Sequence, residues 1–376
     1  MKFLLSPDSY KGSLTAIEVA NNMEIGIRSV LKDADIIKLP IADGGEGTVE
    51  VLVAANQGYI HEANVMGPLY ETVRAKFGVF NNNQTAIIEV AESSGLTLVP
   101  VHSRNPYKTT SYGLGELITC ALDLGCKEII VGLGGSATND GGVGMAQALG
   151  VKFLDQAGQE IPPGGEGLLN IHTIDVKEID TRIKDVQFII ASDVTNPLCG
   201  EFGATAIFGP QKGATSEMVK YLDQGLENLA IKINEQLKLD IRNIQGAGAA
   251  GGLGAGLMAF LSANMQKGID IVFTYTNIEN IMKTVDFIIT GEGFTDEQTM
   301  FGKAPYGVAK MAKKYGKPVI CISGGISIEE SELFQMGMDV IMGTVQAPMN
   351  LEEAMESAGE NVQYTTASVI RTLMIR

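Results

Sequence analysis

Residues 2–30 read KFLLSPDSYKGSLTAIEVANNMEIGIRSV, and this stretch decides the fold. Lys2–Leu5 is a short apolar run that predicts a buried strand. After a polar turn, Thr15 and Glu18 have the spacing of a capping box, which predicts a helix that begins near Thr15. Apolar residues recur every three to four positions along that helix: Ile17, Ala20, Met23, Ile27 and Val30. The stretch therefore predicts a strand followed by a core-facing helix.

The same alternation continues outward from this stretch. Ile36–Leu39 predicts the next strand and Thr48–Asn56 the next helix, which is the βαβα order of a parallel sheet. From residue 59 to residue 90 the pattern changes to three successive strands, with Asn81–Asn83 as a tight turn. This predicts an antiparallel meander. Helices and strands alternate again afterwards, most clearly from residue 285 onward.

We therefore predict an α/β protein with two domains. Residues 1–58 and 283–376 are expected to form a doubly wound, Rossmann-like domain with a parallel sheet. Residues 59–282 are expected to form an inserted second α/β domain that carries the antiparallel meander. The default expectation is an active site in the cleft between the two domains.

Composition excludes several classes of partner. The formal net charge of −16 over 376 residues argues against nucleic acid and against an anionic membrane surface. The four cysteines are scattered without metal or redox spacing, and no apolar run reaches the ~18 residues of a membrane span. The first residues lack the long apolar region of a signal peptide. We expect a cytoplasmic protein, and its oligomeric state is left open.

Six polar segments, five of them with glycine, follow predicted strands, at the edge where α/β sheets bind ligands. They are residues 7–13, 41–48, 132–142, 192–197, 246–254 and 290–299. Glycine lets successive backbone N–H groups converge on phosphate oxygens. The segment 132–142 fits best, because it follows an apolar strand and contains Ser136, Thr138 and Asn139 as further donors. The alternatives are a tight turn for 132–142 and close helix packing for 246–254.

Carboxylates and a few cations lie in these loops. Asp43, Asp193, Glu292 and Asp296 each occur in a loop after a strand, which suits Mg²⁺ ligation or the orientation of an attacking hydroxyl. The cations of interest are Lys11, Lys212, Lys303 and Arg104, which could neutralise a phosphate or grip a carboxylate. The alternatives are helix caps for the carboxylates and solvated surface charges for the cations.

Several chemistries are poorly supported. The three histidines lie outside the glycine-rich loops, so a histidine base is not expected, and no Gly-x₄-Gly-Lys-Ser/Thr loop is present. Segments 132–137 and 246–251 match the loose dinucleotide fingerprint, which keeps a nicotinamide-dependent oxidoreductase for a small hydroxy acid open as an alternative.

Taken together, these loops resemble the bacterial glycerate kinase family, the type unrelated to P-loop kinases. The matching motifs cover essentially the whole chain in family order: PDSYKGSLTA, PIADGGEGT, GLGGSATNDGGVGMAQALG, SDVTNPLCG, GPQKGA, GAGAAGGLGAG and TGEGFTDEQTMFGKAP. The resemblance implies a two-domain α/β fold, the substrates D-glycerate and ATP, and Mg²⁺. It also implies a phosphoglycerate product, 2-phosphoglycerate in preference to 3-phosphoglycerate.

We assign roles to the matched positions on physical grounds. Asp193 is predicted to orient or deprotonate the glycerate hydroxyl, and Lys11 to neutralise the transferring group. Glu292 and Asp296 are predicted to hold Mg²⁺. Substrate-binding residues are predicted to be Arg104, Asp8, Ser9 and Asp43, with Arg104 on the glycerate carboxylate. Nucleotide-binding residues are predicted to be Gly132, Gly134, Gly135, Ser136, Asn139, Lys212 and Lys303. A second alternative function is a non-catalytic glycerate sensor, which would have no need of the loop carboxylates.

Overall fold

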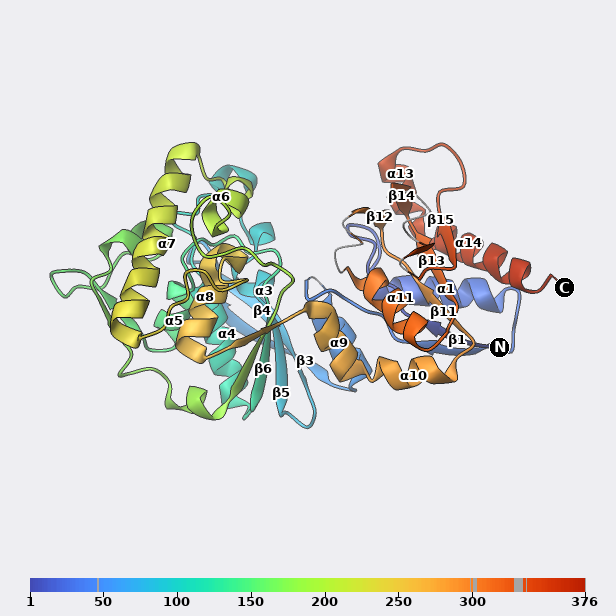
Figure 1. The fold of residues 1–376 in the computed structure, drawn as a ribbon, viewed down its shortest axis with the longest axis horizontal. Helices are drawn as coiled ribbons and strands as arrows, with labels where there is room; N and C mark the ends of the chain where they lie inside the picture. Colours follow the sequence, from blue (N-terminus) through green and yellow to red (C-terminus); the bar gives the residue numbers. More distant parts are fainter. Residues whose placement is uncertain (46, 298, 300–302, 328–333, 336, 376) are drawn as a thin grey trace. The chain divides into compact units, whose positions relative to one another are not determined.

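A computed structural model describes the chain except residues 46, 298, 300–302, 328–333, 336 and 376. Two compact units emerge from the contacts within the chain. Unit 1 comprises residues 1–43, 50–55 and 269–376, and unit 2 comprises residues 44–49 and 56–268. Both chain ends lie in unit 1 (Figure 1). The sequence reading placed residues 269–282 in the inserted domain, whereas these contacts group them with the two chain ends.

Unit 1 is built on a five-stranded parallel sheet. Its order is β15-β13-β11-β1-β2, so β1 lies between β2 and β11. The strands of this sheet are β1 (Lys2–Leu5), β2 (Asp35–Lys38), β11 (Phe287–Thr290), β13 (Val319–Ser323) and β15 (Val340–Gly343). A short two-stranded sheet joins β12 (Phe294–Asp296) and β14 (Gly325–Ser327). The chain order reverses between β1 and β11, which makes this the switch point of a doubly wound sheet.

Helices pack on this sheet in the way the first residues predict. The capping box of Thr15 and Glu18 is present at the start of α1 (Ala16–Arg28). Helix α1 packs against α14 (Ala358–Leu373), where Gly26 lies so close to the backbone of Gln363 that a Cβ would come within 2.5 Å of its carbonyl oxygen. Further helices that the structure describes in this part of the chain are α2 (Thr48–Ala55), α9 (Gly268–Thr276), α10 (Ile278–Thr284), α11 (Ala304–Lys314) and α13 (Leu351–Glu356).

The core of unit 1 follows from strand periodicity. Phe3, Leu5, Ile289, Ile320 and Ile322 form one buried cluster with the apolar residues of α1 and α14. Alternate residues of the same strands, such as Leu4, Ile288 and Cys321, are buried as well. Both faces of the sheet are therefore covered, as parallel sheets require.

Unit 2 is built on a six-stranded mixed sheet with the order β10-β9-β6-β5-β4-β3. Strands β3 and β4 pair antiparallel, as do β4 and β5, while β5, β6, β9 and β10 run parallel. The bounds are β3 (Tyr59–Met66), β4 (Thr72–Phe80), β5 (Thr85–Glu89), β6 (Glu128–Gly132), β9 (Gln187–Ala191) and β10 (Asn264–Gln266). Strands β7 (Lys152–Leu154) and β8 (Thr173–Asp175) form a separate antiparallel pair. The left-handed turn Asn81–Asn83 precedes β5. The predicted fold class, a parallel α/β sheet plus a second α/β part with an antiparallel meander, is confirmed.

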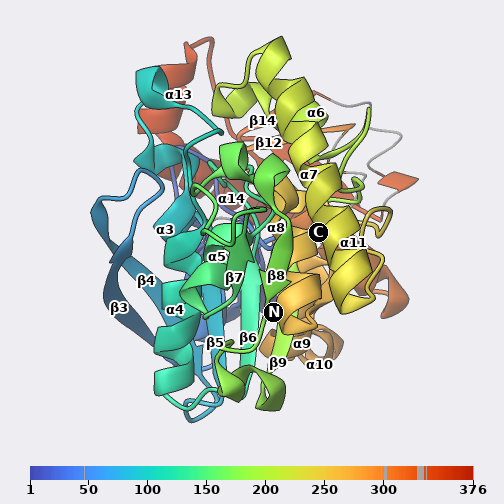
Figure 2. The same ribbon diagram turned by 90° about the vertical axis from the view of Figure 1, so that its left-hand side faces the viewer.

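The helices of unit 2 gather over the sheet (Figures 1 and 2). Helix α4 contacts β3, β5 and α5, and α8 contacts β9. The α-helices of this unit are α3 (Ala91–Ser94), α4 (Tyr112–Asp123), α5 (Val143–Ala148), α6 (Ala204–Phe208), α7 (Ser216–Leu237) and α8 (Ala249–Leu261). Short 3-10 helices are η1 (Leu96–Leu98), η2 (Val101–Ser103), η3 (Gly165–Asn170), η4 (Thr181–Asp185) and η5 (Pro210–Lys212). The segment 246–254, one of the six polar segments, enters helix α8.

Candidate active site

The loops after β1 and β11 are bound to each other at the switch point of unit 1. The backbone N–H of Ser6 donates to the carbonyl of Ile289 and that of Asp8 to the carbonyl of Gly291, both at 2.8 Å. The hydroxyl of Tyr10 donates to the carbonyl of Ile322 at the end of β13. Three strand ends therefore present their loops together, at the position where doubly wound sheets bind ligands.

Buried carboxyl groups meet at this point. The residues Asp8 and Glu292 are only 8% and 6% exposed, although 284 positions separate them in the chain. Burial and the negative charge of Asp43 raise the pKa of Asp8 from the usual 3.8 to about 7, and Glu292 adds to the effect. The backbone N–H of Ser9 donates to Asp8 Oδ1 at 2.6 Å. The loops thus concentrate negative charge where water is largely excluded.

A lysine lies between the two predicted metal ligands. Lys303 Nζ is 3.2 Å from Asp296 Oδ1 and 3.5 Å from Glu292 Oε2. Thr299 donates a hydrogen bond to Glu292 Oε1 at 2.7 Å, and burial raises the pKa of Glu292 against these stabilising contacts. The two carboxylates can therefore share one cation. Hard oxygen donors of this kind suit Mg²⁺, which commonly takes one or two carboxylates and completes its shell with water and phosphate.

The described residues contain no group of three or more His, Cys, Asp or Glu side chains that could hold a metal by themselves. The assignment of Glu292 and Asp296 to Mg²⁺ stays a prediction. It requires phosphate or water oxygens as the remaining ligands.

A cavity of about 740 Å³ in unit 1 collects these groups. Seven of the predicted site residues line it: Asp8, Ser9, Lys11, Asp43, Glu292, Asp296 and Lys303. Lys11 is exposed, so its ammonium is accessible to a ligand. Part of the neighbouring motif, Met300–Gly302, lies outside the described residues. Sequence reasoning missed the apolar residues of the same cavity, because no spacing marks Val345 or Leu351 as neighbours of Asp8.

The second group of predicted residues lies in unit 2, at the carboxyl edge of its parallel strands. The segment 132–142 begins at the last residue of β6, and Gly132 is paired with Ala191 at the end of β9. Gly134 and Gly135 are exposed, whereas Ser136 and Asn139 are buried. Asn139 Nδ2 donates to Thr205 Oγ1 at 2.9 Å. The glycines, and not the polar side chains, are the accessible part of this loop.

Lys212 fixes the shape of that loop from inside the protein. Its side chain is 2% exposed, and Nζ donates to Ser136 Oγ at 3.0 Å and to the Thr138 carbonyl at 2.6 Å. Burial lowers its pKa from 10.5 to about 7, while the nearby Asp140 acts in the opposite direction. Asp140, which sequence reasoning did not single out, is itself buried and accepts hydrogen bonds from the backbone and hydroxyl of Ser111. Both residues hold the loop in place.

Glycines of the segment 246–254 pack against this loop. Gly251 has a left-handed φ of +70°, and a Cβ there would lie 2.0 Å from the Thr138 carbonyl oxygen. The N–H of Gly141 donates to the Gly251 carbonyl at 3.1 Å. These contacts need glycine for close backbone approach, as the packing alternative for this segment proposes.

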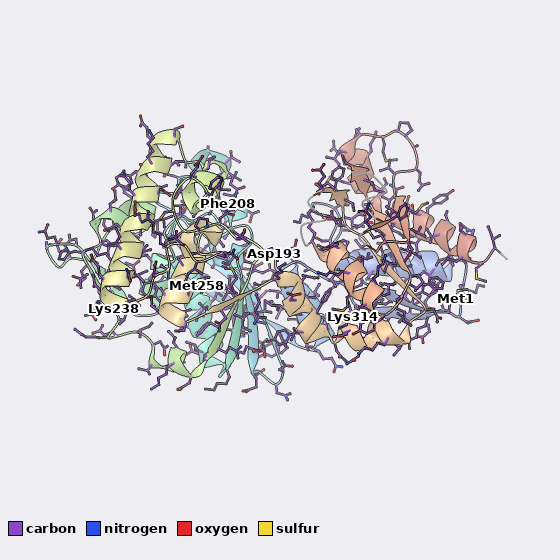
Figure 3. The ribbon with its side chains drawn as sticks, in the orientation of Figure 1. Met1, Asp193, Phe208, Lys238, Met258 and Lys314 are labelled. Atoms are coloured by element: carbon purple, nitrogen blue, oxygen red, sulfur yellow. The ribbon has the colours of Figure 1, made fainter. Side chains whose placement is uncertain are left out.

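Arg104 and Asp193 complete the set in unit 2. The Arg104 carbonyl oxygen lies against Gly213, next to Lys212, where a Cβ would come within 2.4 Å. Arg104 Nη1 donates to the Gln211 carbonyl at 3.4 Å, and its buried Nε has no hydrogen-bond partner among the described residues. Asp193 is exposed on the irregular segment that follows β9 (Figure 3). The structure thus brings the predicted residues together as two sets, one in each unit.

The comparisons with known proteins identify the family. The sequence profile of the glycerate kinase family matches residues 3–374. The glycerate kinase of Bacillus subtilis (strain 168) is 49% identical, with 100% of this chain and 98% of the relative covered. The glycerate 2-kinase of Escherichia coli (strain K12) is 48% identical over the same shares. A crystal structure from Salmonella typhimurium LT2, assigned as a glycerate kinase 2, superposes with a TM-score of 0.91 at 47% identity and covers 100% of this chain and 98% of its own.

The chain belongs to the glycerate kinase family. It is an enzyme, so a non-catalytic sensor is excluded, and the family supports a kinase against the alternative of a nicotinamide-dependent oxidoreductase. Within the described part of the chain, no helix has both the length and the apolar character needed to cross a membrane.

Proposed function

We propose that this enzyme transfers the γ-phosphate of ATP to a hydroxyl of D-glycerate and that the product is 2-phosphoglycerate. One observation carries the proposal. A chain of the glycerate kinase family gathers Asp8, Glu292, Asp296 and Lys303 around one cavity at the switch point of a doubly wound sheet. The name of the Escherichia coli relative, glycerate 2-kinase, supports the position of the phosphate in the product. The cytoplasmic location stays a prediction.

In unit 1, Lys11 neutralises charge on the transferring phosphoryl group, and Glu292 with Asp296 holds Mg²⁺. When bound, Mg²⁺ supplies positive charge to the phosphate oxygens during transfer. Lys303 already places one positive charge between the two carboxylates, which supports the fit of a cation there. Asp8, Ser9 and Asp43 contact the substrates from the adjoining loops.

In unit 2, Asp193 orients or deprotonates the glycerate hydroxyl, and Arg104 binds the glycerate carboxylate. The exposed backbone of Gly134 and Gly135 contributes to phosphate binding. Ser136, Asn139 and Lys212 support that role by holding the loop, because their side chains are buried. A single phosphoryl transfer needs donor and acceptor together, so we propose that both sets of residues act in one catalytic event.

Release of ADP should require both D-glycerate and Mg²⁺. The measurement is a coupled ADP assay over a panel of small hydroxy acids, with NAD-dependent oxidation followed in parallel. NMR of the product separates 2-phosphoglycerate from 3-phosphoglycerate. ADP release that is indifferent to D-glycerate, or turnover of a nicotinamide cofactor, would overturn the proposal.

Arg104→Lys should raise the KM for glycerate and leave the KM for ATP nearly constant. A guanidinium can donate to both oxygens of a carboxylate at once. An ammonium keeps the charge but cannot make this paired contact with the same fixed geometry. The net charge of −16 repels an anionic acid, so local contacts must overcome that repulsion. Arg74→Lys, at an exposed ion pair with Glu62 on β3 and β4, is the matched control. A rise in the KM for ATP instead would assign Arg104 to phosphate binding.

A further inference from the structure

The cavity of unit 1 is larger than the carboxyl cluster and a three-carbon acid can fill. Its volume of about 740 Å³ falls in the range of about 300–1,000 Å³ that is typical of sites for larger organic ligands. Glycerate is small and polar throughout. A second, larger chemical group is needed to account for the remaining space.

The two sides of this cavity differ in chemistry. The carboxylates and lysines come from the loops after β1, β2 and β11, from the end of β12 and from the N-terminus of α11. A second group of lining residues, which we call the apolar side, comes from the loop after β15 and from α13: Val345, Met349, Leu351 and Met355. Phe294, at the start of β12, also lines the cavity, two residues from Asp296. A ligand that fills the site must combine an apolar part with a strongly charged part.

The apolar side is accessible. Phe294 is 53% exposed, Val345 45% and Leu351 76%, which is unusual for three large apolar side chains around one cavity. Close contacts also define the positions of its parts. A Cβ at Gly325 would lie 2.8 Å from Phe294 Cδ2, and Ser13 Oγ donates to the Met355 carbonyl at 2.7 Å. The second contact joins α13 to the loop that carries Asp8 and Lys11.

We propose that this apolar side binds the base and ribose of the phosphate donor, with the ring of Phe294 stacked on the base. A nucleoside triphosphate has the required combination, because its flat apolar base is separated by a ribose from its charged phosphates. The strand order supports the proposal, since doubly wound sheets bind nucleotides at the switch point. The inference rests on the proposed function, in which ATP is the donor, and it assigns the base to apolar side chains that have no role in that proposal.

The chain contains no tryptophan, so Phe294→Trp creates a single fluorescent reporter in the cavity. A non-hydrolysable ATP analogue with Mg²⁺, and ADP, should change its emission. Tripolyphosphate, which has the phosphates without the base, and D-glycerate should not. Tyr364→Trp is the matched control, because Tyr364 is 59% exposed on α14 and does not line the cavity. Its emission should stay constant with every ligand.

Phe294→Ala gives the second readout. Loss of base stacking should raise the Kd of the ATP analogue by about 5- to 150-fold, while the Kd of tripolyphosphate and the KM for glycerate remain near wild type. An unchanged Kd for the analogue, or an equal loss for tripolyphosphate, would overturn the proposal. A response of the Phe294→Trp emission to D-glycerate alone would assign the apolar side to the acceptor instead.

Failure of this inference is distinguishable from failure of the proposed function. If ADP release depends on D-glycerate but the ATP analogue does not change the emission of the Phe294→Trp variant, only the base site is wrong. If ADP release ignores D-glycerate, the glycerate kinase proposal is wrong, while a tryptophan response to ADP but not to tripolyphosphate would still support a nucleotide base in this cavity.

Discussion

Asp193→Asn should lower kcat by about 10²–10⁴-fold and change the Kd of an ATP analogue by less than about threefold, because a general base contributes on that scale to the transition state alone. Asparagine keeps the size and one acceptor oxygen of the side chain but cannot take up the proton of the glycerate hydroxyl. Asp193 is exposed at the carboxyl end of β9, so the substitution leaves the core intact. The measurements are steady-state kinetics and a direct titration of the analogue.

Asp185→Asn is the matched control for this variant. Asp185 is also exposed, and it ends the 3-10 helix that precedes β9, at the opposite end of the same strand from Asp193. It should retain wild-type kcat. If Asp193→Asn also stays within about threefold of wild type, Asp193 has no part in proton transfer, since that change is far below the expected range.

Asp8→Asn should stabilise the folded protein at pH 8, and the gain should shrink as the pH falls. Between the unfolded value of 3.8 and the folded pKa of about 7, the folded protein holds a proton that the unfolded chain has released. The folded state then binds more protons, so the contribution of Asp8 to stability falls as the pH rises through this window. Asparagine cannot ionise and removes that loss.

The expected gain is about 4 kcal/mol at pH 8 and less than about 2 kcal/mol at pH 5, from 1.36 kcal/mol for each pH unit. Part of this gain in stability comes from removing the repulsion between the carboxylates of Asp8 and Asp43. Thermal unfolding of both proteins at the two pH values tests this. Asp33→Asn, which removes an exposed carboxylate of unit 1, should leave the unfolding temperature near wild type at each pH. Equal effects of Asp8→Asn at pH 5 and pH 8 would contradict the prediction.

Local patterns predicted the elements whose signals are confined to neighbouring residues. The capping box at Thr15 is present, and β1 has the predicted bounds. Helix α14 was not predicted, because Thr365 and Thr366 occupy buried positions where the pattern calls for apolar side chains. Helix α8 was not separated from the glycine-rich segment before it. Gly251 and Gly252 adopt left-handed conformations at its start, where they pack against residues 138–141.

The sequence indicated which residues belong to the site more readily than it indicated which of them lie close together. Glycine-rich loops after strands marked Asp8 and Glu292 as candidates, but only the order of the sheet shows that β1 and β11 are neighbours. Lys212 illustrates the opposite case. A lysine beside a glycine suggested an accessible cation, yet its position behind residues 136–138 makes it an internal hydrogen-bond donor. Burial of this kind depends on long-range packing that no short motif records.

The pairing of β1 with β11 has a consequence for synthesis on the ribosome. Strand β1 is made among the first residues, but one of its two neighbours does not exist until Phe287–Thr290 have been added. At about 5–20 residues per second, that delay is on the order of tens of seconds. The continuous segment 56–268 of unit 2 is complete before then. Until then one edge of β1 stays unpaired, although β2 can already cover the other edge, and unit 1 can complete its sheet only after Val340–Gly343 have been added.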